Sequence, residues 1–175
     1  NSALAMWCVD LISRRFVRGD GRAIILLLLL LLPAYQFHAQ RFNANTVLLA
    51  TWPLATYCFL RSFESRTFLW SIAAGAVAAL AMLGKYYSVF LIAGFAVAAI
   101  AHPQRRDYFR SPAPWVSALA GLAVLGPHLW WLATNGSQPF EYAMKAHGGY
   151  SFTSALQEAG WFLSGIAAYL LLPAF

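Results

Sequence analysis

The sequence predicts an all-α fold, a polytopic transmembrane helical bundle with about six to seven spans. Of the 175 residues, 61% are hydrophobic and only 10% are charged, against roughly a quarter charged in an average soluble domain. The apolar residues form long runs separated by short polar segments. The run from Ile24 to Leu32 shows no alternation of polar and apolar residues, which favours helices over the strands of a membrane barrel. This composition excludes a disordered chain.

Seven apolar segments define the predicted spans. We expect residues 1–175 to be part of one transmembrane domain truncated at both ends, because the chain begins with Asn1 and its first and last segments are cut short. The stretch from Trp70 to Ala101 is too long for one span, and residues 84–87 predict a tight helical hairpin in its middle. One long tilted helix plus an interfacial turn is the alternative there. The segments are 1–13, 23–38, 45–61, 68–83, 86–101, 114–133 and 159–175.

The distribution of lysine and arginine predicts the orientation. If the spans alternate in direction, nine cations lie on one side and three on the other. Cytoplasmic loops carry the excess of positive charge, so we expect the side with nine to be cytoplasmic. The opposite side would face the periplasm or the exterior of a bacterial inner (plasma) membrane. The nine are Arg14, Arg15, Arg18, Arg22, Arg61, Arg66, Arg105, Arg106 and Arg110, and the three are Arg41, Lys85 and Lys145.

The net charge of +6 is explained by these loops, and no nucleic-acid partner is expected. On the outer side each cation stands beside polar or aromatic residues, which together predict a cation-bearing cleft at the membrane surface. Lysine and arginine neutralise phosphate, and aromatic rings pack on sugars. The predicted substrate-binding residues are Lys85, Arg41, Tyr86, Tyr87, Asn45, Lys145 and His147.

Simpler roles stay open for several of these residues. Lys85 and Arg41 can be interfacial anchors that extend to the polar surface, and His147 can be a solvated loop histidine. Asn43 or Asn45 can cap the helix that follows. Near the outer end of a later span, His128 is followed by two tryptophans, which indicate an aromatic interface belt.

Five segments also carry a family resemblance. In order and spacing they resemble bacterial glycosyltransferase family 39 membrane proteins, a group related to the dolichyl-phosphate-mannose protein mannosyltransferases and to the aminoarabinose transferases that modify lipid A. The resemblance extends from about residue 23 to 160. The segments are Phe42 to Leu54, Ala81 to Phe90, Tyr108 to Trp115, Gly126 to Leu132 and Pro139 to Ala143.

The resemblance implies a GT-C architecture and an enzyme that moves a sugar from a polyprenyl-phosphate donor to a lipid, glycan or protein acceptor at the outer face. It implies an acidic catalytic base in a first outer loop, expected upstream of Asn1, so the catalytic residue is left unassigned and the fragment is expected to be inactive alone. Asn45 stands where many relatives have aspartate. In the lipid A-modifying branch an outer glutamate–histidine pair lies near a metal, and Glu141 and His147 fall in the comparable region. A divalent metal is therefore possible.

The same outer cleft would also suit two other classes of protein. A transporter or flippase of a lipid-linked or anionic substrate needs the cation without chemistry, although no internal repeat indicates one. A non-catalytic membrane subunit would need neither Lys85 nor Arg41. In all three cases membrane lipids are partners.

Overall fold

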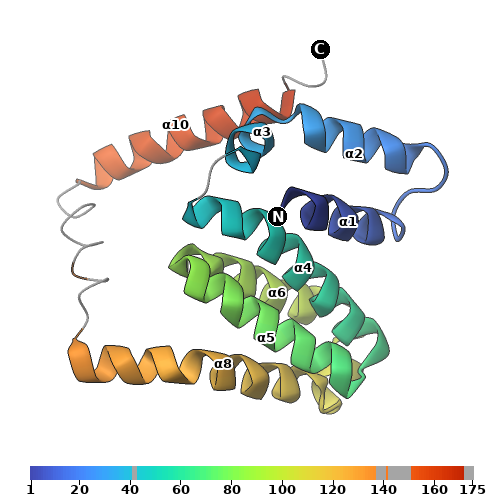
Figure 1. Cartoon of the computed structure of the whole chain (residues 1–175), viewed down its shortest axis with the longest axis vertical. Helices are drawn as coiled ribbons and strands as arrows, with labels where there is room; N and C mark the ends of the chain where they lie inside the picture. Colours follow the sequence, from blue (N-terminus) through green and yellow to red (C-terminus); the bar gives the residue numbers. More distant parts are fainter. Residues whose placement is uncertain (41–42, 137–140, 142–150, 172–175) are drawn as a thin grey trace.

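The computed structural model describes residues 1–40, 43–136, 141 and 151–171, and within them all regular structure is helical (Figure 1). The all-α prediction is confirmed. The elements are α1 (Ser2–Ser13), α2 (Gly21–Leu31), α3 (Pro33–Ala39), α4 (Ala44–Ser65), α5 (Phe68–Gly84), the short 3₁₀ helix η1 (Tyr86–Ser88), α6 (Val89–Ala101), α7 (Arg105–Arg110), α8 (Ala113–Asn135) and α10 (Phe152–Leu171).

Among the described helices, α8 alone is long and apolar enough to cross a membrane by itself. Helices α1, α2 and α5 and the segment Tyr86–Ala101 are apolar but have only 10–17 residues. At 1.5 Å per residue, such helices fall short of a hydrocarbon core of about 30 Å. The number of spans therefore stays a prediction.

Small side chains fill the interior of the bundle, and large apolar side chains cover its surface. Ala55 and Ala81 are completely buried, whereas Leu119 is 68% and Phe90 66% exposed. In water this distribution would be unfavourable, but small residues at helix contacts and large apolar residues outside are typical of helices packed in lipid. The distribution supports a membrane location for the bundle.

Helix α5 packs between α4 and α8, and its contact with α8 is a close backbone crossing. A Cβ atom at Gly75 would lie only 1.9 Å from the carbonyl oxygen of Ser117, and Gly121 faces Gly75 from α8. Serine hydroxyls join the three helices at this level. Ser62 Oγ and Ser71 Oγ are 3.0 Å apart, and Ser117 Oγ donates to the Ser71 carbonyl at 2.9 Å.

The predicted hairpin is confirmed, and the alternative of one long helix is wrong. Helix α5 ends at Gly84, and Lys85 is extended, with φ −163° and ψ 128°. The 3₁₀ helix η1 then leads into α6, which packs back against α4.

The prediction of one continuous helical span over residues 23–38 is wrong. Leu32 is extended, with ψ 119°, and separates α2 from α3. The cause is Pro33, because the proline ring disfavours the helical conformation of the residue before it. Pro33 itself occupies the first turn of α3, where its missing N–H is tolerated.

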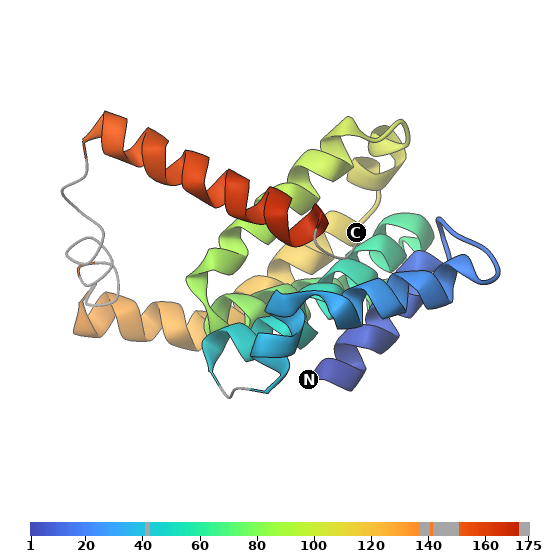
Figure 2. The same cartoon turned by 90° about the horizontal axis from the view of Figure 1, so that it is seen from above.

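The last helix begins earlier than its predicted span of 159–175. Helix α10 extends over Phe152–Leu171. Its side chains are exposed along nearly the whole described length, and Figure 2 shows it outside the bundle of α1, α4, α5 and α8.

Candidate functional site

The bundle has two polar ends with different charge. The arginine end consists of residues 10–22, 61–66 and 105–110, where α1, α4 and α7 meet. The lysine end consists of residues 43–45, 85–88 and 128–131, where the start of α4 meets the end of α5 and the C-terminal half of α8. Long-range contacts hold each end together: Arg15 binds Glu64 at the first, and Lys85 binds Asn45 at the second. Loops predicted to share a side of the membrane are therefore close in space.

At the arginine end two acidic side chains, Asp10 and Glu64, are hydrogen-bonded to arginines. Arg15 Nε and Nη2 donate to the two carboxylate oxygens of Glu64 at 2.7 and 3.0 Å. Hydrogen bonding within this pair raises the pKa of Arg15 and lowers the pKa of Glu64. Asp10 accepts hydrogen bonds from Arg14, at 2.7 Å, and from Arg22.

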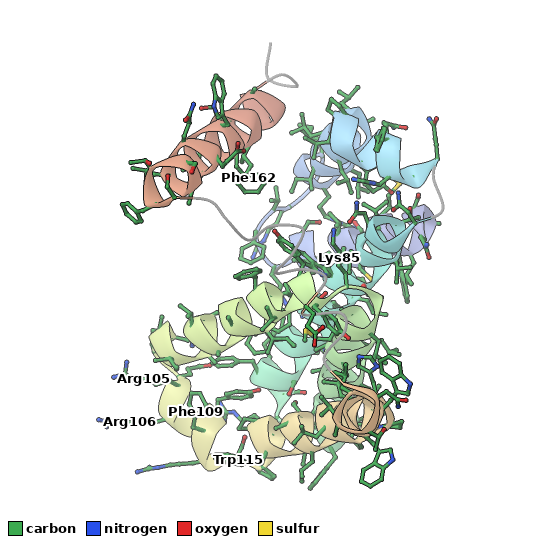
Figure 3. The ribbon with its side chains drawn as sticks, turned by 90° about the vertical axis from the view of Figure 1, so that its left-hand side faces the viewer. Lys85, Arg105, Arg106, Phe109, Trp115 and Phe162 are labelled. Carbon is green, nitrogen blue, oxygen red and sulfur yellow. The ribbon has the colours of Figure 1, made fainter. Side chains whose placement is uncertain are left out.

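At the lysine end Lys85 has neutral partners. Its Nζ donates to Oδ1 of Asn45 at 2.8 Å and lies 5.2 Å from the centre of the Tyr87 ring (Figure 3). An amide oxygen and an aromatic face orient an ammonium group but carry no net negative charge. Among the described residues no carboxylate pairs with Lys85. Asn45 and Tyr87 therefore orient the ammonium group of Lys85, and no carboxylate in the described residues neutralises its charge.

The capping alternative for the two asparagines is resolved. Asn43 is the N-cap of α4: its side chain accepts from the backbone N–H of Thr46 at 3.1 Å, and Thr46 Oγ1 reaches back to the backbone N–H of Asn43 in a capping box. Asn45 is not the cap. Its side chain is thereby free of helix capping and bonds to Lys85.

The backbone around Lys85 is fixed against α4. Ser88 is completely buried, and its Oγ donates to the Ala81 carbonyl at 2.8 Å and accepts from Trp52 Nε1 at 3.0 Å. A Cβ atom at Gly84 would lie 3.2 Å from Cγ1 of Val47, which shows how closely the end of α5 approaches α4. The turn that carries Lys85 is therefore anchored on both helices.

The two tyrosines after Lys85 have different surroundings. Tyr87 is 63% exposed. The hydroxyl of Tyr86 lies 2.6 Å from Nε2 of His128, and the His128 ring stacks on Trp131 with centroids 6.0 Å apart. The two tryptophans near His128 predict an interface belt, but the sequence does not predict the contact between His128 and Tyr86. The spacing of three between His128 and Trp131 indicates their pairing on one helix face, whereas Tyr86 is 42 residues away.

A cavity of about 350 Å³ lies beside Asn45, which forms part of its wall. The aromatic side chains of Tyr35, His38 and Trp52 also line it, none of which was predicted from the sequence. Nδ1 of His38 is buried and has no hydrogen-bond partner. Aromatic faces together with unpaired polar atoms suit a sugar ring, whose faces are apolar and whose edges carry hydroxyls.

The remaining predicted residues are not tested. Arg41, Lys145 and His147 lie outside the described residues, so the structure does not show whether they approach Lys85. Within the part of the chain that the structure describes, no group of three or more histidine, cysteine, aspartate or glutamate side chains is placed to hold a metal ion. The predicted divalent metal stays an expectation.

Fold and site together define a helical membrane protein in which Lys85, at a polar end of the bundle, lies beside an aromatic ring and has no carboxylate partner in the part of the chain that the structure describes. The chain belongs to the dolichyl-phosphate-mannose-protein mannosyltransferase family, whose profile matches residues 1–131 of the 175. This family consists of membrane glycosyltransferases of the GT-C type. The match includes the whole lysine end but not Lys145 or His147. No curated protein and no solved structure matches the chain.

Proposed function

We propose that the protein transfers a sugar from a polyprenyl-phosphate donor to an acceptor at the outer face of a bacterial inner membrane, and that Lys85 binds the donor phosphate. One observation carries this proposal: Lys85 is oriented by Asn45 and Tyr87, which are both neutral. An ammonium group already paired with a carboxylate would gain little from a phosphate. Here the full charge is available to the ligand.

The transfer needs this charge at the leaving group. The bond between the anomeric carbon and the phosphate oxygen breaks, a bond from the acceptor oxygen to the anomeric carbon forms, and the acceptor proton passes to a base. The polyprenyl phosphate departs with an additional negative charge, which an ammonium group stabilises more strongly in the transition state than in the donor. Asn45 has no ionisable group, so the proposal gives it an orienting role.

Two cavities support a lipid-linked sugar as the donor. The cavity beside Asn45 offers the aromatic faces of Tyr35 and Trp52 to a sugar. An apolar cavity of about 570 Å³ lies between α4, α5, α6 and α8, with Ala79, Ile92 and Leu125 among its lining residues. It is suited to a hydrocarbon chain that extends from the phosphate along the bundle. Arg41, Lys145 and His147 complete the proposal as further contacts of the outer loops with the donor.

The substitution Lys85→Ala tests the proposal. We expect it to lower the rate of sugar transfer about a hundredfold, the order of magnitude for removal of one group that stabilises charge in a transition state. Lys85→Arg keeps the charge and should keep part of the rate. Arg105→Ala removes one cation from the opposite end of the bundle and should leave the rate unchanged. The measurement is transfer from radiolabelled polyprenyl-phosphate sugars in proteoliposomes, at matched protein levels.

An unchanged rate for Lys85→Ala would overturn the assignment of Lys85. The same vesicles also distinguish transfer from transport. Formation of a new glycosidic bond to an acceptor supports the transferase. Movement of the lipid-linked sugar across the bilayer with no new glycosidic bond supports a flippase instead.

A further inference from the structure

A polar cavity of about 320 Å³ lies at the arginine end and has no part in the proposed transfer. It opens between the last turns of α1 and the last turns of α4. Its lining residues are Leu11, Arg14, Arg15, Tyr57, Arg61 and Glu64.

The carboxylate in this cavity is already bound. Both oxygens of Glu64 accept hydrogen bonds from Arg15, whereas Nη1 of Arg61 is 3.9 Å from the nearer of them, beyond hydrogen-bonding distance. Nε of Arg61 is buried and has no hydrogen-bond partner. The guanidinium of Arg61 therefore has unused donors at the cavity.

The local charges do not cancel. Arg14 is bonded to Asp10, but Asp10 also binds Arg22. Four arginines (Arg14, Arg15, Arg22 and Arg61) thus face two carboxylates (Asp10 and Glu64), which leaves a surplus of two positive charges. The C-terminal carbonyls of α1 add little negative charge at the cavity, because Arg15 Nη1 donates to the Leu11 carbonyl at 3.0 Å.

Aromatic rings hold the guanidinium groups in place. Arg15 lies 5.3 Å from the centre of the Tyr57 ring and Arg61 lies 5.2 Å from the Trp70 ring, and these two rings meet edge to face at 5.6 Å. Phe16, on the loop after α1, is 75% exposed. Tryptophan and tyrosine are enriched at the depth of the lipid head groups, so we expect the cavity to lie at that depth on the arginine-rich side of the membrane.

From this geometry we propose that the cavity binds the phosphodiester of an anionic phospholipid. Fixed guanidinium groups match phosphate oxygens in shape and charge, and basic pockets between helices at the inner side of a membrane are suited to such head groups. The aromatic and aliphatic lining accommodates the beginning of the acyl chains. A free phosphate ion would gain the charge but not these apolar contacts.

The test is native mass spectrometry of the detergent-solubilised protein titrated with phosphatidylglycerol. In the double variant Arg14→Gln/Arg61→Gln, we expect the apparent Kd to rise roughly fivefold for each arginine removed. The matched control is Arg105→Gln/Arg106→Gln. It removes the same charge at the same end, from two exposed side chains that point away from the bundle (Figure 3). Arg15 is left intact because it fastens α1 to α4.

The control variant should bind phosphatidylglycerol as the unaltered protein does. Phosphatidylethanolamine and inorganic phosphate, titrated in parallel, should bind much more weakly, which identifies an anionic lipid as the ligand. Equal loss of binding in both double variants would overturn the proposal in favour of general attraction to the arginine end. An unchanged Kd in Arg14→Gln/Arg61→Gln would overturn it as well. If that variant does not fold, the single variant Arg61→Gln gives the same decision with a smaller change.

Discussion

The two polar ends of the bundle hold most of their cations in different ways. At the arginine end, carboxylates lie within hydrogen-bonding distance of Arg14, Arg15 and Arg22. The pairs of Arg15 with Glu64 and of Arg22 with Asp10 connect neighbouring helices, whereas Arg61 has no hydrogen bond to a carboxylate. At the lysine end a single cation rests on an amide and an aromatic ring. Paired charges hold a structure together, whereas an oriented but uncompensated charge is available to a ligand. The partner of a cation is thus more informative about function than the number of cations nearby.

The largest effect is expected at the crossing of α5 and α8, which lies between the two ends. In Gly75→Ala the new Cβ atom would lie 1.9 Å from the Ser117 carbonyl oxygen, so the two backbones must separate. We expect a loss of about 3 kcal/mol in the free energy of unfolding, the upper end for overpacking. Thermal unfolding with a thiol-reactive dye would measure it, because Cys8 and Cys58 are free and buried.

The matched control for that substitution is Gly94→Ala, where no atom lies within 4 Å of the new methyl group. It should not destabilise the protein. Because both ends depend on the crossing, Gly75→Ala should impair sugar transfer and lipid binding together. Loss of only one of them would show that the ends are supported independently.

A smaller effect, confined to the lysine end, is expected for Ser88→Ala. The substitution leaves the indole N–H of Trp52 without its acceptor, which costs about 1 kcal/mol for a half-buried donor. It also releases the turn that carries Lys85, so the KM for the donor should rise while phosphatidylglycerol binding at the other end is unchanged. Ser65→Ala is the control, since that hydroxyl is exposed at the arginine end. An equal rise in KM for Ser65→Ala would contradict the distinction between the ends.

The smallest effect is expected for Glu64→Gln. The carboxylate is 43% exposed, so its pair with Arg15 stabilises the protein by less than about 1 kcal/mol. Arg15 lowers the pKa of Glu64 in the folded protein, below about 4.3 for the unfolded chain. The stabilisation is therefore present above that pH and is lost as the pH falls through the folded pKa. Unfolding curves between pH 3 and 7 should show a shallower acid dependence for Glu64→Gln, and an unaltered slope would exclude this pair as a contributor.

Local features of the fold could be predicted from the sequence. The hairpin at Lys85 follows from a glycine within an apolar stretch too long for one span, and the cap of α4 follows from asparagine before a helix-forming run. The break before Pro33 is equally local, but hydropathy alone predicts one continuous span there, because the residues on both sides of the break are apolar. The break can be predicted from Pro33 itself, because a proline disfavours the helical conformation of the residue before it, here Leu32.

The site could be predicted only in part. The sequence predicts Lys85 as a binding residue, because ionisable residues beside a membrane span usually have a function. The sequence does not predict that Lys85 binds Asn45. The two residues are 40 apart in the chain, and their hydrogen bond depends on how α5 packs against α4. The same holds for Tyr86 with His128 and for Arg15 with Glu64, 49 residues apart. Such contacts depend on the relative rotation of whole helices, which periodicity does not specify.

The hydroxyl of Ser71 has a consequence for the distant end of its helix. Apolar helices in lipid can slide and rotate past one another at little expense, but Ser71 is hydrogen-bonded to Ser62 and its carbonyl accepts from Ser117. A shift of α5 by one residue would break both of these contacts between helices, and only the bond of the Ser71 hydroxyl to the Thr67 carbonyl of its own helix would remain. Lys85 follows Ser71 by 14 residues, about 21 Å along the helix axis. A deletion or insertion anywhere between them would turn the ammonium group away from Asn45, so the length of this segment is itself under constraint.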